Sequence, residues 1–589
     1  MSFLKSYFGL WIVFFISLLA IVPLFQSGFF PMHDDTQVAR VYEMGKALKD
    51  GMFPVRWVAD LGYGYGYPLF NFYAPLAYYF GGMFNLFGFD ALISTKIMMG
   101  FGMIFAGISM YLLARQFWGE FGGIVSGLMY VFAPYHAVQL YVRGDVAELW
   151  AYAFIPLAFW GFYKIFITES TFHRHSGKRG TSASLQARMT NSIWKWTIIS
   201  SVGYASIVLS HNLTALMVTP FLIIVILLTC YIVLKHKKPY AISYTILAFI
   251  LGVLLSAFYW LPVFAEMKYT NVLSQIGGGA DFKDHFVCFS QLWNSPWGFG
   301  GSTKGCLDGI SFKIGKLHIL FAIVSLFPVP LFWKKEKRKV FVIGMVWLLF
   351  LFSIYLTLDS SQFLWNFIKP MAFFQYPWRF LILISFAASF LSGAVIWFGL
   401  QFVRKSKHGN LYQYLVIIFV IGIIVFQNLK LFTPQKFFQV NSAHYTNDYA
   451  LKWDASKISD EYMPPYFTKP PSSNQTINSK LTVINGSAEV LQQHQKTQNY
   501  SATLLVQRPS KILLQTAIFP AWKIFVNGRV INCSNTTRGY LFPLPPGNQR
   551  IEVTFVQTPI ERVANILSLA GIAVLIIGII YSRKRLYHE

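Results

Sequence analysis

Residues 7–24, YFGLWIVFFISLLAIVPL, form an apolar run that contains no charged side chain. A helix of this length can cross the hydrocarbon core of a bilayer. Comparable runs recur along the chain, near residues 92–113, 121–138, 147–167, 193–210, 213–234, 240–262, 314–333, 340–357, 378–400, 411–431 and 563–581. The sequence therefore predicts a polytopic α-helical membrane protein with about twelve transmembrane helices.

The composition agrees with this fold class. Of the 589 residues, 55% are hydrophobic and only 12% are charged, whereas a soluble domain carries roughly a quarter charged residues. These values exclude a soluble enzyme, a disordered chain and a small disulfide-stabilised scaffold. The 49 Lys and Arg residues outnumber the 24 Asp and Glu residues, but most of this excess lies in short loops between apolar runs. We therefore expect contact with membrane lipids and no nucleic-acid partner.

The basic loops predict the topology. They occupy every second connection between the apolar runs, at 173–188, 235–238, 334–339, 404–407 and 583–585. The positive-inside rule places all of them on the cytoplasmic side. The expected location is thus the bacterial cytoplasmic (inner) membrane, with cytoplasmic N and C termini and an extracytoplasmic active site. The first run resembles an uncleaved signal anchor.

This topology divides the chain into three parts. Residues 1–431 form a transmembrane domain. The apolar stretch 72–88 is short and contains Pro75, so residues 25–91 are predicted to form one long external loop. The helices of this loop are expected in the outer interface. Residues 432–562 are polar, with short β-type runs and turn signals at Asn527-Gly528 and Pro545-Pro546-Gly547, and predict an extracytoplasmic β-rich domain, a small sandwich. Residues 563–589 form the last transmembrane helix and a basic tail.

A further external loop, 265–313, contains Cys288 and Cys306. An oxidising compartment allows a disulfide between them, although the sequence does not supply the geometry.

The most informative polar segment is Pro31-Met32-His33-Asp34-Asp35-Thr36, directly after the first apolar run. Adjacent carboxylates beside His33 could bind a divalent metal ion, Mg or Mn, through Asp34 and Asp35, or act as a general base on an acceptor hydroxyl. In the structural alternative, Asp35 is the N-cap of the helix expected after it.

The next segment combines Arg56 with a stretch in which Gly and Tyr alternate. Flat amphipathic rings on a flexible backbone suit a sugar or lipid headgroups, and an interfacial aromatic belt is the alternative. The candidate groove residues in this stretch are Tyr63, Tyr65, Tyr67, Asn71 and Tyr73, and the other candidates for the groove are His33, His211, Asn212, Gln375 and Trp378.

Three more clusters lie at predicted external ends of spans. Arg143, Asp145 and Glu148 share one short loop, where a local Arg143–Asp145 ion pair is the alternative to a functional role. His211 and Asn212 lie between two spans, where either hydrogen bonding or ligand binding would explain them. The third cluster comprises Gln375, Trp378 and Arg379 at the entry to a span. Its arginine can bind a phosphate, unless it merely snorkels to the interface.

Together these segments resemble bacterial membrane proteins of the YfhO type and the neighbouring family named pyruvoyl-tetrahydropterin-synthase-related. The resemblance rests on His33-Asp34, Pro54-Val55-Arg56-Trp57, the stretch GYGYGYPLFNFYAPLAYYF, Tyr141 to Glu148, Ser210-His211-Asn212, Gln375 to Arg379 and, near the C-terminus, Phe519 to Gly528. It implies a glycosyltransferase of the GT-C superfamily that uses a polyprenyl-phosphate sugar donor. At Asp35 the sequence departs from the expected small or apolar residue, which favours Asp34 as the essential carboxylate.

The resemblance implies transfer of a sugar, with inversion, to a glycan, lipid or protein acceptor outside the membrane. Asp34 is the expected general base. Asp35, Asp145 and Glu148 are expected to position the acceptor or a metal ion, and Arg379, Arg56 and Arg143 to bind the phosphate.

Two other functions remain open from the sequence. A lipid-linked polysaccharide transporter or flippase should carry ionisable residues near the middle of its spans, whereas the candidates here cluster at span ends. In a non-catalytic envelope-assembly protein, function should depend on the β-rich domain and not on Asp34.

Overall fold

The computed structural model describes residues 7–176, 183–235, 239–275, 280–403 and 408–587. Within them, seven helices are long and apolar enough to cross a membrane, or eight if the bent pair at 241–269 is one span. The candidate spans are Phe8–Phe25, Ala91–Val131, Val146–Thr168, Lys337–Thr357, Pro377–Val403, Gly409–Leu431 and Pro559–Ser582. The chain is therefore a multi-pass helical membrane protein.

The elements follow one another in this order: α2 (Phe8–Ile21), η1 (Val22–Phe25), α3 (Gln37–Lys49), α4 (Leu69–Phe72), α5 (Leu76–Leu86), α6 (Ala91–Val131), α7 (Pro134–Val138), η2 (Gln139–Arg143), α8 (Val146–Ser176), α9 (Ala183–Ser210), α10 (Asn212–Lys235), α11 (Pro239–Leu255), α12 (Ala257–Glu266), η3 (Met267–Tyr269), η4 (Val272–Gln275), η5 (Phe282–Asp284), α13 (Phe289–Trp293), α14 (Lys316–Val324), α15 (Val329–Phe332), α16 (Lys337–Thr357), η6 (Asp359–Ser361), α17 (Gln362–Phe367), η7 (Lys369–Phe374), η8 (Pro377–Phe380), α18 (Leu381–Val403), α19 (Gly409–Asn428) and η9 (Leu429–Leu431). The C-terminal region adds α20 (Ser442–Thr446), η10 (Ala450–Ala455), α21 (Ser456–Ile458), η11 (Asp460–Tyr462), η12 (Ser473–Gln475), β1 (Leu481–Lys496), β2 (Asn499–Leu514), β3 (Trp522–Val526), β4 (Arg529–Val530), β5 (Ser534–Thr536), β6 (Gly539–Leu544), β7 (Gly547–Phe555) and α22 (Pro559–Tyr587).

The 41-residue element α6 is a helical hairpin rather than one straight helix. Gly119 has φ 70° and ψ −172°, which interrupts the helix. On either side the chain runs back along itself, because a Cβ on Gly127 would lie 2.8 Å from the carbonyl oxygen of Gly107. Only glycine tolerates this backbone conformation without strain. The two limbs correspond to the runs expected near 92–113 and 121–138.

Several predicted spans are shorter or broken in the structure. The run expected at 240–262 is bent by 61° between α11 and α12, and the apolar parts of the runs at 213–234 and 314–333 reduce to Asn212–Leu228 and Lys316–Phe332. The run at 193–210 belongs to α9, which is not among the candidate spans of the described residues. The prediction of about twelve full spans is therefore confirmed only for the seven or eight candidate spans of the described residues.

The C-terminal strands form one antiparallel sheet in the order β4-β3-β7-β2-β6-β5, with β1 paired to the other edge of β2. The first part of β2 pairs with β7 and its last part with β6, so β2 is the spine of the sheet. The expected turn at Asn527-Gly528 is present, with positive φ at both residues. The expected sandwich is wrong, because all seven strands belong to one sheet.

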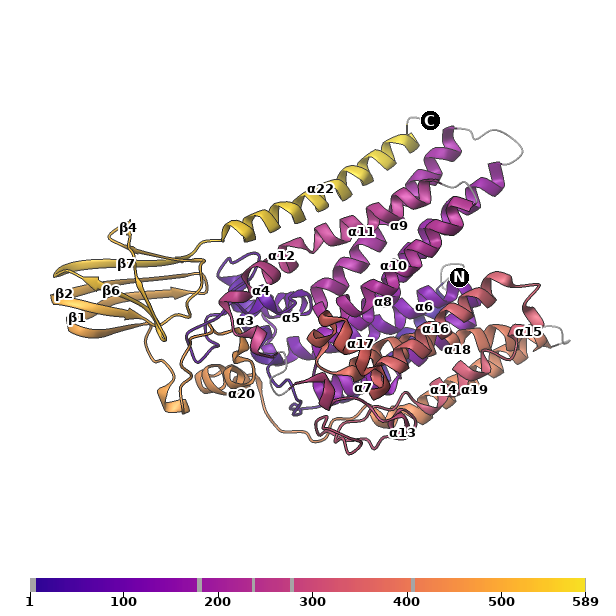
Figure 1. Ribbon diagram of the computed structural model, residues 1–589, viewed down its shortest axis with the longest axis horizontal. Helices are drawn as coiled ribbons and strands as arrows, with labels where there is room; N and C mark the ends of the chain where they lie inside the picture. Colours follow the sequence, from indigo (N-terminus) through magenta and orange to yellow (C-terminus); the bar gives the residue numbers. More distant parts are fainter. Residues whose placement is uncertain (1–6, 177–182, 236–238, 276–279, 404–407, 588–589) are drawn as a thin grey trace.

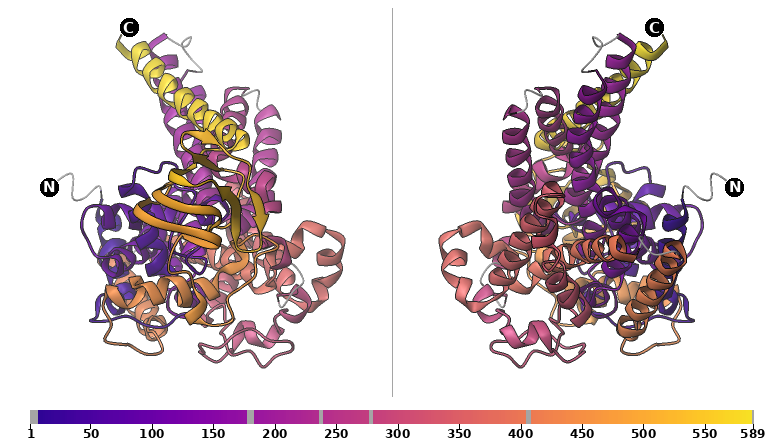
Figure 2. Two further views of the ribbon diagram at one scale, coloured as in Figure 1. Left: turned by 90° about the vertical axis from the view of Figure 1, so that its left-hand side faces the viewer. Right: turned by 90° about the vertical axis from the view of Figure 1, so that its right-hand side faces the viewer.

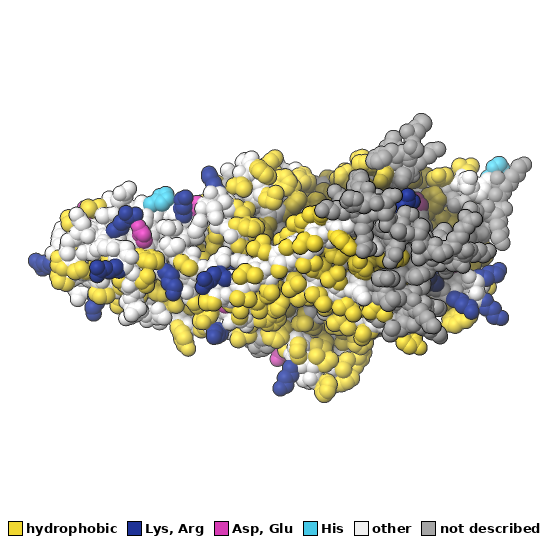
Figure 3. Space-filling view, turned by 90° about the horizontal axis from the view of Figure 1, so that it is seen from above, with side chains coloured by type: hydrophobic (Ala, Val, Ile, Leu, Met, Phe, Trp, Pro, Cys, Tyr) yellow, Lys and Arg dark blue, Asp and Glu magenta, His cyan; other side chains and the backbone are white. Residues whose placement is uncertain are grey.

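This sheet stands at one end of the helical bundle, and both chain termini point to the other end (Figure 1). The last helix, α22, runs back from the sheet and packs against α9, α11 and α12 (Figure 2). A broad apolar band crosses the middle of the surface, and Lys and Arg side chains gather towards both ends (Figure 3). The side of the membrane on which each end lies stays a prediction.

Part of the first loop packs against the C-terminal region, and the expected position of its helices in the outer interface stays a prediction. Trp57 contacts Phe519, Trp522 and Phe555 of the C-terminal region. The backbone of Tyr65 accepts a hydrogen bond from Ala517 (3.3 Å). Residues 25–91 thus pack directly against the C-terminal region. The disulfide Cys288–Cys306 is present and closes the loop that contains it.

Candidate active site

Asp34 lies where the first loop crosses the loop before α8. The backbone N–H of His33 donates to the carbonyl of Val142 (3.1 Å), and that of Asp34 donates to the carbonyl of Arg143 (2.9 Å). The Asp34 side chain is half-buried, and within the described part of the chain no group donates a hydrogen bond to its carboxylate. An unengaged carboxylate in this position is available to accept a proton from a ligand.

Arg143 is held by two acids. One of its terminal nitrogens donates to Glu148 (2.6 Å) and the other to Asp145 (2.5 Å). The Tyr135 hydroxyl and the Gln139 amide also donate to Glu148. The predicted local pair of Arg143 and Asp145 therefore exists, within a larger buried network that includes Glu148.

Arg379 approaches the same place from η8. The guanidinium of Arg143 lies 4.7 Å from the ring centroid of Trp378, the residue before Arg379. Arg379 is buried, and its Nη1 donates to the carbonyl of Phe374 (2.7 Å) and to the amide oxygen of Gln375 (3.3 Å). Gln375 has a φ of 62°, a strained value for this residue type that the contact with Arg379 helps to maintain.

A third arginine, Arg40 of α3, was not among the sequence candidates. It is 4% exposed and its guanidinium lies 4.2 Å from the ring centroid of Tyr73. Among the described residues, neither Arg40 nor Arg379 has an acidic group within ion-pair distance, and the Nε of each is buried without a hydrogen-bond partner. Buried cations without a counter-charge are costly, which indicates a site for an anionic ligand.

These charges set the proton affinity of Asp34. Burial and the neighbouring Asp145 raise the pKa of Asp34, and the opposing effects of Arg143, Arg40 and Arg379 do not cancel the rise. Burial also raises the pKa of Asp145, but Arg143 outweighs burial, and the net pKa lies below its usual range. Asp34 is therefore the more basic of the two carboxylates at neutral pH.

His211 faces the same charges from the junction of α9 and α10. Burial lowers its pKa, while Asp145 and Glu148 act in the opposite direction. Its Nδ1 lies 2.8 Å from the hydroxyl of Thr214. Asn212, in contrast, is exposed and accepts a hydrogen bond from the backbone of Leu213.

Asp35 has surroundings different from those of Asp34. It lines a cavity of about 230 Å³ together with His444, Tyr445 and Asp454. Burial raises its pKa to about 6, partly offset by His444. It does not cap α3: the N-cap position is Thr36, and no side chain there accepts a capping bond.

Arg56 and Asn71 lie in another buried network. Arg56 donates to Asn71 (2.5 Å) and to Asn565 of α22 (2.9 Å), and its Nε lies 3.7 Å from Glu561. Asn71 in turn donates to Glu266 of α12 (2.7 Å). This network connects the first loop to α12 and α22, and Arg56 has an acidic partner in it, although its buried Nε makes no hydrogen bond.

The alternating tyrosines contact the C-terminal region. Tyr63 donates to Asp460 and stacks on Phe467, and Tyr67 stacks on Tyr462. Tyr65 meets Phe467 edge to face. All three are buried, whereas Tyr73 lies against Arg40. Their predicted role in a substrate groove stays a prediction, and both Tyr73 and Tyr67 interact with Arg40 of the cluster around Asp34.

The residues around Asp34 do not fit a divalent metal ion. In the described part of the chain, no group of three or more His, Cys, Asp and Glu residues could hold one. Asp34 and Asp35 have separate neighbours, and Arg40, Arg143 and Arg379 already surround Asp34 with positive charge. The shared Asp34–Asp35 metal site expected from the sequence therefore lacks support in the geometry.

Comparisons with known proteins give weak matches. No family model matches the chain. An uncharacterized protein of Lactococcus lactis subsp. cremoris is 24% identical over 341 residues, 56% of this chain and 50% of the relative, so this chain covers half the length of the relative. The expected family therefore stays a prediction.

Among solved structures, the oligosaccharyltransferase of Archaeoglobus fulgidus tethered to an acceptor peptide matches with a TM-score of 0.45 and 12% identity, covering 81% of this chain and 61% of that chain. ArnT from Cupriavidus metallidurans bound to undecaprenyl phosphate matches with a TM-score of 0.35 and 10% identity, covering 77% and 76%. TM-scores of this size carry no argument about function.

Proposed function

We propose that this protein is a glycosyltransferase that moves a sugar from a polyprenyl-phosphate carrier to an extracytoplasmic acceptor, which is a wall polymer, a glycolipid or a protein. The observation that carries the proposal is the arrangement around Asp34. A half-buried carboxylate with a raised pKa lies among three arginines, two of them without an acidic partner in the described chain. A general base beside an anion site is what displacement of a phosphate leaving group requires.

In the proposed reaction, Asp34 accepts the proton of the acceptor hydroxyl. The acceptor oxygen forms a bond to the anomeric carbon, while the bond from that carbon to the phosphate oxygen breaks. The electron pair leaves with the polyprenyl phosphate, and attack from the opposite face inverts the anomeric centre. Protonated Asp34 then returns its proton to water or to the released phosphate.

Arg379 and Arg40 stabilise the leaving phosphate in this scheme. Their guanidinium groups are buried, so their charge is poorly screened, and developing negative charge on the phosphate is the main electrostatic demand of the transition state. Arg143 is committed to Asp145 and Glu148. These two acids hold Arg143 in place. Arg143 in turn positions Asp34, because its backbone carbonyl accepts the hydrogen bond from the Asp34 N–H.

The test is direct transfer by the purified full-length protein in detergent or nanodiscs. The protein is incubated with radiolabelled polyprenyl-phosphate sugars and membrane extract as acceptor, with and without chelator. We expect donor consumption and a labelled product, both unchanged by the chelator. If no member of a broad donor panel is consumed above a heat-inactivated control, the proposal is contradicted.

A further inference from the structure

A second pocket lies away from Asp34, between the segment after 280 and the connection from α16 to α18. Its volume is about 250 Å³. The lining residues are Ala280, Asp281, Phe282, Lys283, Trp365, Asn366, Lys369 and Ala372. The assignment of Asp34 and the three arginines leaves this pocket without a function.

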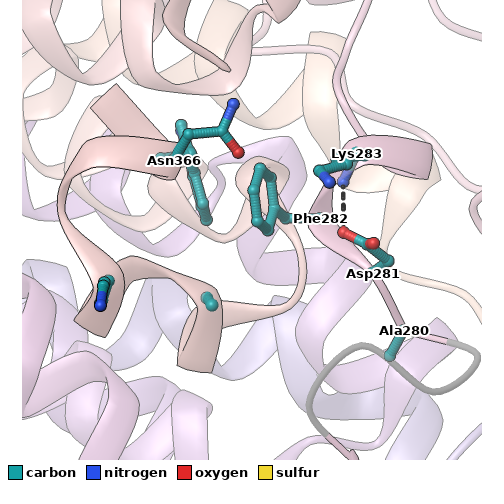
Figure 4. Close-up of a pocket in the computed structure, with 8 residues that line it drawn as sticks. Ala280, Asp281, Phe282, Lys283 and Asn366 are labelled. Carbon is teal, nitrogen blue, oxygen red and sulfur yellow. Dashed lines mark hydrogen bonds between the residues drawn. The ribbon is translucent and has the colours of Figure 1, made fainter. Parts of the chain in front are cut away.

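We propose that this pocket binds the headgroup of an anionic phospholipid of the surrounding membrane, such as phosphatidylglycerol. Lys283 and Lys369 line the pocket, and within the described residues neither has an acidic partner within ion-pair distance. Asp281 lines it as well, but its carboxylate accepts a hydrogen bond from the Lys283 backbone N–H (3.1 Å; Figure 4). Two lysines against one aspartate leave a net positive lining, which complements the single charge of a phosphodiester.

The polar groups suit a hydroxylated headgroup. Figure 4 shows Asn366 beside Phe282, with Asp281 on the neighbouring segment. The amide of Asn366 and the remaining acceptor capacity of Asp281 can bind glycerol hydroxyls, while the lysines bind the phosphate. The volume is below the roughly 300–1,000 Å³ typical of pockets that enclose a whole small molecule, so only a headgroup fits inside.

The helix α17, which contributes Trp365 and Asn366 to the lining, supplies apolar surface for the acyl chains. Phe363 and Phe367 are 62% and 83% exposed. They flank Asn366 on α17 and are four residues apart, so they lie on one side of the helix. The segment joins the candidate spans Lys337–Thr357 and Pro377–Val403, so it must lie at the boundary of the membrane. Exposed phenylalanines continuous with the spans are expected in contact with lipid.

The experiment measures lipid binding by native mass spectrometry of the full-length protein in detergent, titrated with phosphatidylglycerol or phosphatidylcholine. We expect tighter binding of phosphatidylglycerol. A Lys283→Ala/Lys369→Ala variant should bind it about tenfold more weakly, the loss expected for two partly exposed charge contacts. The matched control, Lys511→Ala/Lys523→Ala, removes the same charge from exposed positions on the sheet and should bind normally.

Each other result overturns the proposal. Equal binding of the two lipids would show no headgroup selectivity, and equal loss in the control variant would show a general charge effect. Competition by millimolar inorganic phosphate alone would identify a free phosphate site. Retained affinity in Phe363→Ser/Phe367→Ser would show that no acyl chain contacts these two residues of α17. Preference for unmodified polyprenyl phosphate would assign the pocket to the carrier. Thermal unfolding of every variant verifies that it folds.

Discussion

At the scale of single residues, the account depends on which charges are already neutralised. Arg143 has Asp145 and Glu148, and Arg56 has Glu561 and two asparagines, so both guanidinium groups have an acidic partner inside the protein. Arg40 and Arg379 are buried without an acidic partner within ion-pair distance in the described chain, and their hydrogen bonds go to neutral groups only. We therefore propose the anion site at these two arginines, and the phosphate role predicted for Arg56 and Arg143 stays a prediction.

The first prediction concerns Arg379 and Arg40. Arg379→Ala and Arg40→Ala should each lower donor turnover about a hundredfold or more, the roughly 2–4 kcal/mol expected for a lost charged contact in the transition state. Arg379→Lys should keep partial activity, because lysine retains the charge but not the planar fork that holds two phosphate oxygens. Turnover is measured with varied donor at fixed acceptor.

Arg550, which is 70% exposed and paired with Glu552 on the sheet, provides the control as Arg550→Ala and should leave turnover unchanged. If Arg379→Ala and Arg40→Ala fold normally and keep more than about a third of wild-type turnover, neither arginine binds the leaving phosphate.

The second prediction concerns the pH profile. Transfer should fall as pH drops through the pKa of Asp34, which lies above the ordinary value of 3.8 because of burial and Asp145. Asp145→Asn removes a nearby negative charge and frees Arg143, and both effects lower the pKa of Asp34. The acidic limb of kcat/KM should therefore move to lower pH.

Asp448→Asn is the control for this shift, since Asp448 is exposed and paired with Lys452. A limb that stays in place in Asp145→Asn, or moves to higher pH, would show that Asp34 does not govern it.

At the scale of elements, the sequence predicted positions well where the chain is locally regular. The apolar runs at 7–24, 378–400 and 563–581 became helices, and Asn527-Gly528 became the turn between β3 and β4. The strand β1 was missed because its residues are mostly polar and exposed, so no alternation marks it. Arg40 was missed because it is one of four charged residues in the helix α3, and only tertiary packing shows that it lacks an acidic partner.

The third prediction concerns the helical hairpin α6. Gly119→Ala should lower the free energy of unfolding by about 1–2 kcal/mol, because Gly119 has a φ of 70° that a Cβ disfavours. The space beside it is open, since a Cβ at this position would lie 4.0 Å from the nearest atom, on Trp397, so backbone strain alone is tested. Thermal unfolding in detergent measures the effect.

The matched control is Gly344→Ala in α16, where a Cβ would meet nothing within 4 Å and the backbone is helical. It should unfold at the wild-type temperature or slightly above it. Equal stability of both variants would contradict the hairpin.

At the scale of the whole molecule, the candidate site lies where the first loop, the span ends and the C-terminal region meet. The sequence placed Asp34, Arg143, Asp145, Glu148, His211 and Arg379 at span ends on one predicted side, and the structure brings them into one electrostatic neighbourhood. The sequence could not separate the surroundings of Asp35 from those of Asp34, or show that Arg56 pairs with Glu561, because those contacts join segments hundreds of residues apart.

The fourth prediction concerns topology. Single cysteines introduced as Ser290→Cys and Arg538→Cys should react with an impermeant thiol reagent added outside intact cells, because these exposed positions belong to the predicted extracytoplasmic end. Glu336→Cys, in a basic loop, should react only after the membrane is opened. Labelling of positions 336 and 538 from the same side would invalidate the predicted orientation.

The central claim is that Asp34 removes the proton of the acceptor, and Asp34→Asn tests it most directly. The substitution keeps the size of the side chain and removes its basicity. We expect sugar transfer from radiolabelled polyprenyl-phosphate donors to be abolished while thermal unfolding stays near wild type, with a milder loss in Asp35→Asn. Wild-type transfer by a folded Asp34→Asn protein would contradict the account.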